Sequence, residues 1–170
     1  SFARFHQYWW SNRFYASLAR RHGRKGRLLE IGSGLGHLVA QLEGFFATAA
    51  LDLNPWALER SRQVAANTLH AAGSAQALPF PPGTFDTLII KHVVEHLPDP
   101  AGAIVELGRI LAPGGCLILS TPNLASLLKP WKGREWIGYR DPTHISLKEP
   151  GEWLALLRAT GFNIRRVFSD

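Results

Sequence analysis

The sequence predicts an α/β protein built on a doubly wound, mostly parallel sheet with helices on both faces. Three observations predict this fold class. Short apolar runs alternate with longer amphipathic stretches over the 170 residues, and a glycine-rich turn follows the first run. Two runs, Thr87–Ile90 and Leu117–Leu119, are apolar without a break, which is typical of strands buried on both faces. In such a sheet the ligand binds across the carboxyl ends of the strands, near the point where the winding reverses.

Each expected element follows from its pattern and its boundaries. The expected strands are short apolar runs bounded by Gly, Pro or Asn, and they cover Arg27–Ile31, Thr48–Asp52, Leu69–Ala72, Asp86–Lys91, Gly115–Ser120 and Asn163–Val167. The expected helices are amphipathic, and they cover His37–Glu43, Pro55–Asn67, Pro100–Leu111 and Pro150–Thr160. Asn54 and Asp99 stand as N-caps, each before a proline at the first helical position. Strands that alternate with helices in this way imply right-handed βαβ units.

Composition narrows the class of protein. The chain has 46% hydrophobic and 19% charged residues and shows no repeats and no linker. We therefore expect one domain, 1–170. Cys116 is the single cysteine, which excludes an intramolecular disulfide and a multi-cysteine zinc site. No apolar run approaches the ~18 residues of a membrane helix, and the opening residues do not resemble a signal peptide. We therefore expect a cytoplasmic protein without a membrane partner.

The net charge of +6 raises the question of nucleic acid. The densest basic run, Arg20–Arg27, lies where a helix should end, and cations there complement the helix dipole. No RNA-recognition or zinc-finger signature accompanies it. The pattern favours a solvated helix end over a phosphate-binding patch, so we do not expect a nucleic-acid partner.

The most informative segment is the glycine-rich turn after Arg27–Ile31. Gly32, Gly34 and Gly36 would let the backbone approach a bound ligand closely, although a tight strand-to-helix turn is the structural alternative. A dinucleotide-binding loop requires its third glycine where this chain has His37, which disfavours an NAD(P)-dependent oxidoreductase. Asp52 ends the next strand, where an acidic side chain accepts hydrogen bonds from ribose hydroxyls. Loop and acid together indicate a ligand that contains adenosine.

These residues belong to a longer series of motifs that resembles the class I S-adenosylmethionine-dependent methyltransferases, of the type 11 and type 12 small-molecule kind. The motifs occur in the family's order, within a match from about Gly26 to Phe162, at Leu29–Gly36, Leu51–Asn54, Ala77–Phe80, Gly83–Asp86, Val93–Leu97, Arg109–Gly115 and Ser120–Asn123. The resemblance implies a Rossmann-like fold and S-adenosyl-L-methionine as the cofactor. It also implies methyl transfer to an oxygen, nitrogen or carbon nucleophile of a small molecule.

The resemblance also implies roles for particular residues. Glu30 and Gly32 would hold the amino-acid end of the cofactor, Asp52 the ribose, Leu53 one adenine face, and the Ala75 N–H the ring edge. The full expected cofactor set is Glu30, Gly32, Ser33, Gly34, Gly36, Asp52, Leu53, Ser74, Ala75, Lys91 and His92.

Two positions in this set need comment. Many relatives carry aspartate at Ser74, and this departure keeps a catalytically silent S-adenosylmethionine-binding domain as an alternative function. The backbones of Lys91 and His92 would lie beside the methionine moiety, and we interpret the Lys91 side chain as solvated or paired rather than catalytic.

The segment His92–His96 allows a metal interpretation, which we do not adopt. It spells the inverted zinc-protease pattern, but Pro98 ends the helix that this pattern requires. Some methyltransferases similar to ubiquinone-pathway and small-RNA 3′-end enzymes place a metal on a Glu-x-x-Glu-His cluster, and His92 stands where the first glutamate would be. With His144 as a fourth ligand, a metal site stays an alternative. The other interpretation is that Glu95 and His96 have a structural role, in which they are buried and hydrogen-bonded. We predict no metal.

The acceptor side is expected after the fifth strand. Leu124–Ser146 has no regular periodicity, and long loops at the carboxyl ends of strands usually bind something. Asp141–His144 resembles a motif near the substrate mouth of small-molecule methyltransferases, so His144 is the candidate general base, with a structural histidine held by Asp141 as the alternative. The candidate substrate residues are aromatic or basic: Tyr8, Trp131, Trp136, Tyr139 and Arg140.

The domain is expected to have three parts and an incomplete sheet. Residues 1–25 would form an aromatic helical lid, or a helix packed on the core or on a second subunit; residues 26–123 the cofactor-binding core; and residues 124–170 the substrate loop with a C-terminal helix and strand. The chain would act as a monomer or homodimer. The family's sheet has seven strands, with the seventh between the fifth and sixth. Because the sequence ends soon after Asn163–Val167, we expect that seventh strand to be missing.

Overall fold

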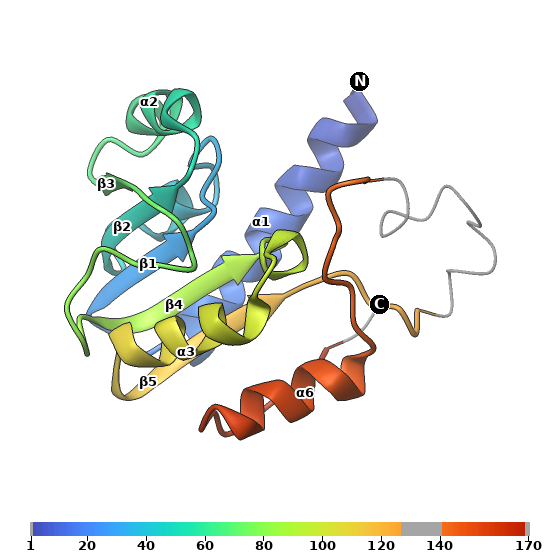
Figure 1. Cartoon of the computed structure of the whole chain (residues 1–170). Helices are drawn as coiled ribbons and strands as arrows, with labels where there is room; N and C mark the ends of the chain where they lie inside the picture. The colour runs from blue at the N-terminus through green and yellow to red at the C-terminus, as the bar shows by residue number, and fades with distance from the viewer. Residues whose placement is uncertain (1, 127–140, 169–170) are drawn as a thin grey trace.

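The computed structural model describes residues 2–126 and 141–168, which form one parallel sheet with helices on both faces (Figure 1). The sheet has five strands in the order β3-β2-β1-β4-β5, so the winding reverses between β1 and β4. The strands are β1 Arg27–Ile31, β2 Ala47–Asp52, β3 Leu69–Ala72, β4 Phe85–Lys91 and β5 Leu111–Ser120. The helices are α1 Phe2–His22, α2 Pro55–Val64, α3 Pro100–Ile110 and α6 Pro150–Ala159, with 3₁₀ turns η1 Val39–Leu42 and η2 Val94–His96. The predicted fold class is confirmed.

Alternation along the central strands builds two cores. On one face, Leu29 and Leu88 pack with Ile104 of α3 and Trp153 of α6. On the other face, Leu28 and Ile89 pack with alanines of α1 and leucines near η1, namely Ala16, Ala19, Leu38 and Leu42. Neighbouring strand residues therefore point to opposite faces, and both faces are covered. No helix in the described ranges has the length and apolarity to span a membrane.

The predicted N-caps are confirmed, and they begin α2 and α3 where the sequence placed them. Asn54 Oδ1 accepts from the N–H groups of Trp56 and Ala57, at 3.0 and 3.4 Å. Asp99 Oδ1 accepts from Gly102 N–H at 2.9 Å. These bonds satisfy N–H groups that the first helical turn leaves without partners. They also fix the loops that leave β2 and β4 at the carboxyl edge of the sheet.

The expected helix over His37–Glu43 is wrong. Only the single 3₁₀ turn η1 forms there. The preceding loop carries three glycines with positive φ, at Gly32, Gly34 and Gly36, so a helix cannot begin before residue 37. The Glu30 carboxylate of β1 accepts a hydrogen bond from Val39 N–H, and this bond holds the first residue of η1 in place. The four residues of η1 are soon followed by Gly44, whose positive φ leaves no room for a longer helix.

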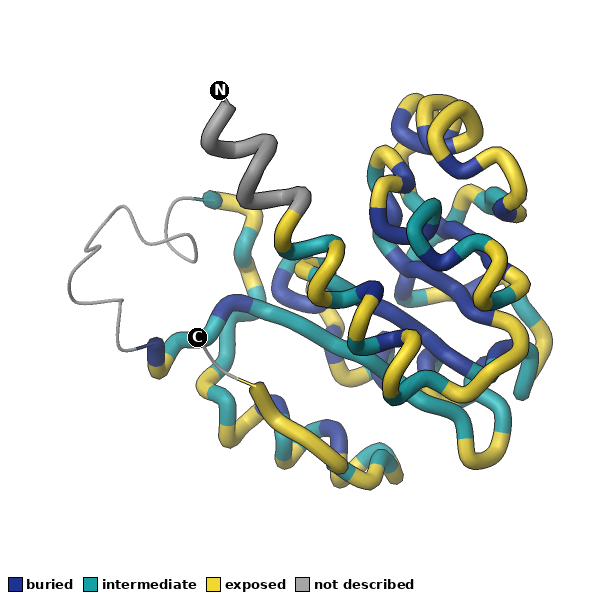
Figure 2. The backbone as a smooth tube through the Cα atoms, turned by 180° about the vertical axis from the view of Figure 1, so that it is seen from behind, coloured by how far each residue is buried: buried dark blue, intermediate teal, exposed yellow. Residues whose placement is uncertain are grey.

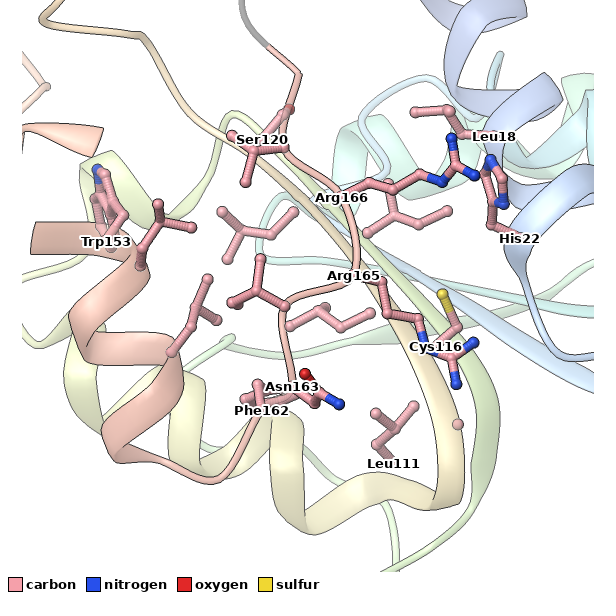
Figure 3. A pocket seen from close by; sticks show the side chains of 18 of the residues that line it. Leu18, His22, Leu111, Cys116, Ser120, Trp153, Phe162, Asn163, Arg165 and Arg166 are labelled. Carbon is pink, nitrogen blue, oxygen red and sulfur yellow. The ribbon is translucent and has the colours of Figure 1, made fainter. Parts of the chain in front are cut away.

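The expected strand over Asn163–Val167 is also wrong, because that segment pairs with no strand in the described part of the chain. It lies across a groove of about 1700 Å³ from β5, and α1 and α6 line the ends of that groove (Figure 3). Thr121 and Trp153 line it too, and their buried Oγ1 and Nε1 atoms have no hydrogen-bond partner in the described part of the chain. Figure 2 shows the contrast: β1 and β4 are buried, whereas β5 is half-buried and residues 163–168 are mostly exposed. Among the described residues β5 is thus the edge of a five-stranded sheet.

Candidate active site

The glycine loop leaves β1 at the centre of the carboxyl edge, next to the point where the winding reverses. Gly32 N–H and Ser33 N–H both donate to Leu51 O of β2, at 2.8 and 3.1 Å. A Cβ on Gly32 would lie 2.3 Å from Val93 Cγ2, and the φ of Gly32 is +71°. The loop is therefore pressed between β2 and the segment after β4, and its backbone stays accessible only because it has no side chain there.

Asp52 joins this loop to the end of β2. Its Oδ2 accepts from Gly34 N–H at 2.7 Å, and its Oδ1 accepts from Asn54 N–H at 2.8 Å. Each carboxylate oxygen has a second lone pair, so the side chain is held in place and can still accept from a ligand's hydroxyl groups. The next residue, Leu53, is 76% exposed and offers apolar surface beside the carboxylate.

The end of β3 lies next to Asp52. Gly73 N–H donates to Asp52 O at 3.1 Å, which brings the following turn to the same edge. Ser74 Oγ accepts from Gln76 N–H at 3.2 Å, and Ala75 is buried. The structure thus brings together the expected ribose and adenine residues from the loops after β1, β2 and β3.

Glu30 lies beneath the glycine loop instead of at its rim. The residue is only 4% exposed, and its Oε2 accepts from Val39 N–H at 2.9 Å. Burial raises the pKa of Glu30 to about 8, with nearby Lys91 acting in the opposite direction. The buried hydroxyl of Ser33 has no hydrogen-bond partner within the described ranges. Two polar groups that favour a further partner therefore lie at the loop, which fits a polar ligand end.

Lys91 and His92 end β4 on the other side of the reversal. Lys91 Nζ donates to Asn12 Oδ1 of α1 at 2.8 Å and lies 5.2 Å from the centroid of the Tyr15 ring. The interpretation of Lys91 as paired is confirmed, and its partner is an amide of the N-terminal helix. His92 has a φ of +53°, unusual for a residue with a side chain. That backbone turns its Nδ1 to 3.2 Å from Glu95 Oε1.

A second cluster lies just beyond His92 and contains Glu95, His96 and His144. Each offers one ligand atom, and these atoms lie within 4.8 Å of one another. The Glu95 side chain is completely buried, and its Oε2 has no hydrogen-bond partner among the described residues. Ser146 N–H donates to Glu95 O at 2.9 Å, which fastens the segment carrying His144 onto η2.

Hydrogen bonds orient the His96 ring. Thr143 Oγ1 donates to Asp141 Oδ1 at 2.5 Å, so its oxygen must accept from His96 Nδ1–H, which lies 2.9 Å away. The same bond to Thr143 lowers the pKa of Asp141. In a neutral His96 the lone pair is therefore on Nε2, the atom not engaged by Thr143. One carboxylate and two imidazoles can hold a borderline divalent cation or can move a proton.

The structure does not describe the side chains of the expected substrate residues. Trp131, Trp136, Tyr139 and Arg140 lie outside the described residues, and Tyr8 lies in the part of α1 whose side chains are not described. Sequence reasoning missed Asn12, and it gave no separate role to Tyr15, an aromatic of the expected lid, or to Thr143 of the Asp141–His144 motif. Asn12 and Tyr15 are three apart on one helix, a spacing that places them on one side and was the available signal.

Comparison with known proteins decides the family. A family model for a methyltransferase domain matches residues 2–167. The chain belongs to the class I S-adenosylmethionine-dependent methyltransferases. Its cofactor is S-adenosylmethionine, and this assignment decides against the nicotinamide interpretation of the glycine loop.

Relatives of this methyltransferase are longer than the chain. It is 30% identical over 159 residues to the ubiquinone biosynthesis O-methyltransferase of Thiobacillus denitrificans, covering 83% of this chain and 66% of that protein. The enzyme of the same name from Burkholderia ambifaria is 31% identical over 161 residues, 88% of this chain and 69% of that one. The chain therefore spans about two thirds of the length of these curated relatives.

Solved structures support the fold. A Thermotoga maritima S-adenosylmethionine-dependent methyltransferase, titled a possible histamine N-methyltransferase, superposes with a TM-score of 0.74 at 22% identity. The superposition covers 95% of this chain and 78% of that one. At this identity the likeness concerns the fold alone, and it agrees with the sheet described above.

Proposed function

We propose that this methyltransferase binds S-adenosylmethionine across the carboxyl ends of β1 to β4 and methylates an oxygen of a small molecule. The observation that carries the proposal is Asp52, whose carboxylate is held between the glycine loop and α2 with lone pairs left for a ribose. Curated relatives at 30–31% identity are named O-methyltransferases, which favours oxygen over nitrogen or carbon as the acceptor atom.

In this proposal, different residues of the chain bind different parts of the cofactor. Asp52 accepts from the ribose hydroxyls, and exposed Leu53 covers one face of the adenine beside the turn at Ser74 and Ala75. The glycine loop admits the chain that leads to the methionine end, where Ser33 Oγ and Glu30 favour a further polar partner. When bound, the cofactor supplies a methyl group activated by a positively charged sulfur.

His144 and His96 prepare the acceptor. A hydroxyl must lose its proton as its oxygen gains the methyl group, and an imidazole can take that proton near neutral pH. The Asp141–Thr143–His96 chain fixes one imidazole, and its neighbour His144 has its ring centroid 4.7 Å away. We assign His144 as the base that receives the proton and Glu95 as the buried acceptor that supports the pair. No metal is required for this proton transfer.

Calorimetry tests cofactor binding. We expect S-adenosylhomocysteine to bind the unsubstituted protein and NADH not to bind. Tight NADH binding without S-adenosylhomocysteine binding would overturn the proposal. The cytoplasm as compartment and a monomer or homodimer as assembly stay predictions from the sequence.

Methyl transfer from labelled S-adenosylmethionine to a panel of hydroxylated small molecules tests the reaction. His144→Asn should lower kcat and remove the acidic limb of the pH profile, where a histidine base becomes protonated. His22→Asn, which changes a histidine of α1 remote from this cluster, serves as the matched control. If the protein binds S-adenosylhomocysteine and His144→Asn leaves both rate and profile unchanged, the assigned base is wrong.

A further inference from the structure

We infer that Lys91 receives the carboxylate of the cofactor's methionine moiety, and that helix α1 positions it for this contact. The inference rests on the proposed function and extends it to a side chain and a helix. It concerns which way the amino-acid end of the cofactor lies in the site.

The position of Lys91 follows from strand register. Lys91 is the last residue of β4 and pairs with Ser120 of β5, while the residue before it pairs with Ile31, the last residue of β1. Ile31 leads directly into the glycine loop. Lys91 therefore lies at the carboxyl edge of the sheet, one strand from that loop and beside the reversal of the winding.

Among the described residues, Lys91 has no carboxylate within ion-pair distance. Its Nζ has three N–H donors, of which one is used by the Asn12 amide oxygen at 2.8 Å. The Tyr15 ring at 5.2 Å adds a cation–π contact, and it too is neutral. Burial raises the pKa of Glu30 and lowers that of Lys91, and the two groups act on each other electrostatically without an ion-pair contact.

A half-buried cation with donors to spare favours an anion. The cofactor's carboxylate is its one anionic group, whereas its sulfur and its amino group are cationic. Asp52, on the β2 side of the glycine loop, attracts the ribose end, so the amino-acid end must extend toward β4. There Lys91 attracts the carboxylate and repels the ammonium group, which leaves the ammonium on the side of Glu30. Asn12 and Tyr15 hold the lysine in place, so α1 takes part in binding without touching the reacting atoms.

The experiment compares two ligands that differ at the amino-acid end. S-adenosylhomocysteine has the carboxylate, and 5′-methylthioadenosine lacks both amino-acid groups. Calorimetry on Lys91→Met should show S-adenosylhomocysteine weakened about tenfold or more, with 5′-methylthioadenosine within about twofold. Lys91→Arg keeps the charge and should restore most of the affinity, and Asn12→Ala should show a smaller loss confined to S-adenosylhomocysteine. Lys25→Met removes an equal charge from an exposed position and should change neither affinity.

The outcomes separate the inference from the proposed function. If the unsubstituted protein does not bind S-adenosylhomocysteine, the proposed function fails. If it binds and Lys91→Met weakens both ligands equally, or weakens neither, Lys91 is structural and the inference is overturned. If thermal unfolding shows that Lys91→Met does not fold, Asn12→Ala decides by the same contrast: a loss confined to S-adenosylhomocysteine supports the inference, and an equal loss or none overturns it.

Discussion

The two flanks of the sheet differ in how the segments at their carboxyl edges are held together. On the β3–β2–β1 flank, the loops at the carboxyl edge are tied to one another by Asp52 and Gly73 and to the core by Glu30. On the β5 flank, a groove of about 1700 Å³ separates the edge strand from residues 163–168, and no residue in the described ranges bonds the buried Thr121 Oγ1 and Trp153 Nε1 that line it. Its own hydrogen bonds therefore organise the β3–β2–β1 flank, whereas helix packing mainly holds the β5 flank.

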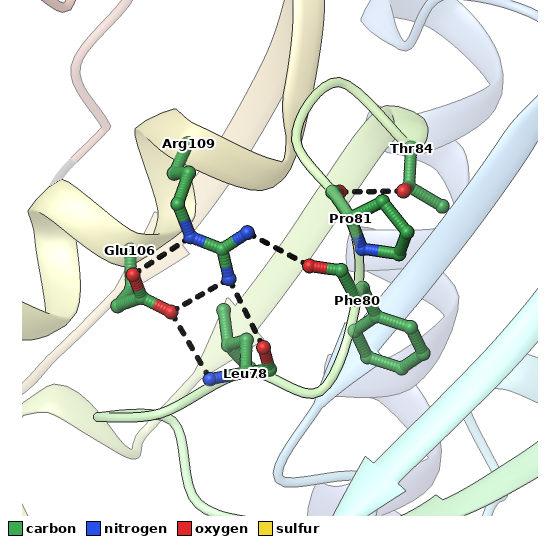
Figure 4. A network of polar contacts seen from close by, with 6 residues as sticks. All are labelled: Leu78, Phe80, Pro81, Thr84, Glu106 and Arg109. Carbon is green, nitrogen blue, oxygen red and sulfur yellow. Dashed lines mark hydrogen bonds and ion pairs between the residues drawn. The ribbon is translucent and has the colours of Figure 1, made fainter.

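One network on the loop between β3 and β4 shows how this organisation reaches across the sequence (Figure 4). Arg109 of α3 donates to both carboxylate oxygens of Glu106, to Phe80 O at 2.8 Å and to Leu78 O at 3.0 Å. Glu106 in turn accepts from Leu78 N–H at 3.1 Å, and these contacts lower its pKa. The segment that follows the turn at Ser74 and Ala75 is therefore held in place by a helix about 30 residues further along the chain.

The largest expected effect is on the pH dependence of the free energy of unfolding, and it concerns Glu30. Its folded-state pKa of about 8 exceeds the ordinary 4.5, so the unfolded chain ionises first as pH rises. The folded state, which keeps Glu30 protonated, therefore loses stability progressively between about pH 4.5 and pH 8, by roughly 5 kcal/mol in total. Glu30→Gln should abolish this loss while still accepting from Val39 N–H. Urea unfolding of both proteins at pH 5, 7 and 9 measures it, and parallel stability profiles would contradict it.

Removal of Asp52 should have the next largest effect, and it tests the organised flank directly. In the proposed site, Asp52→Ala would remove two charge-assisted contacts to the ribose, and it releases Gly34 N–H, so S-adenosylhomocysteine affinity should fall by about 2–4 kcal/mol. Glu59→Ala, an exposed acid of α2 paired with Arg62, removes the same charge and should leave affinity unchanged. An unaltered dissociation constant in Asp52→Ala would place the pocket elsewhere.

Two glycines of one loop form a matched pair. Both have positive φ, but a Cβ on Gly36 would lie 2.2 Å from Ser61 Oγ and 3.2 Å from Ser61 Cα, whereas one on Gly34 meets nothing within 4 Å. Gly36→Ala should therefore cost about 2 kcal/mol more stability than Gly34→Ala, which bears only the backbone strain. Chemical unfolding gives both values. Equal costs would mean that α2 yields without resistance and that the loop is less constrained than its contacts indicate.

The smallest effect is expected on the β5 flank. Burial raises the pKa of the Cys116 thiol, which lines the groove, so less thiolate forms at pH 8 than for a free cysteine. Labelling with a chromogenic disulfide should be slower than that of glutathione, by about tenfold or less. Because Cys116 is the single cysteine, the signal is unambiguous. A rate equal to that of glutathione would show that the groove opens freely to solvent.

Local rules account for what the sequence could predict. β1 and β3 have the predicted bounds, and β2 and β4 begin one residue early, because alternation and flanking glycines are local signals. β5 begins four residues before the predicted Gly115, as the chain pairs with Phe85 across an irregularity in register before Thr87. The strand at Asn163–Val167 failed because pairing depends on a neighbour that no local pattern specifies.

The residues of the candidate site also fall into two groups: those that the local sequence could predict and those that only the fold brings together. Asp52 and the glycine loop could be placed at one edge of the sheet because they end neighbouring strands and lie only 18 residues apart, whereas the ribose role of Asp52 stays a prediction. Lys91 and Asn12 are 79 residues apart, and Thr143 and His96 are 47 apart, so only the folded chain brings each pair together.

The separation of these contacts along the chain also sets an order of events during folding. Gly34 and Asp52 are 18 residues apart, and β1, β2 and β3 meet through connections of similar length, so little chain entropy is lost when this flank closes. Helix α1 instead reaches Lys91, and Arg24 reaches Pro113, over some 80 to 90 residues. We expect the β1–β2–β3 unit to gain amide protection first in pulsed hydrogen exchange, and the contacts of α1 with the end of β4 to form after those with β1 and η1. The affinity for the adenosine end would then appear during refolding before the affinity for the amino-acid end.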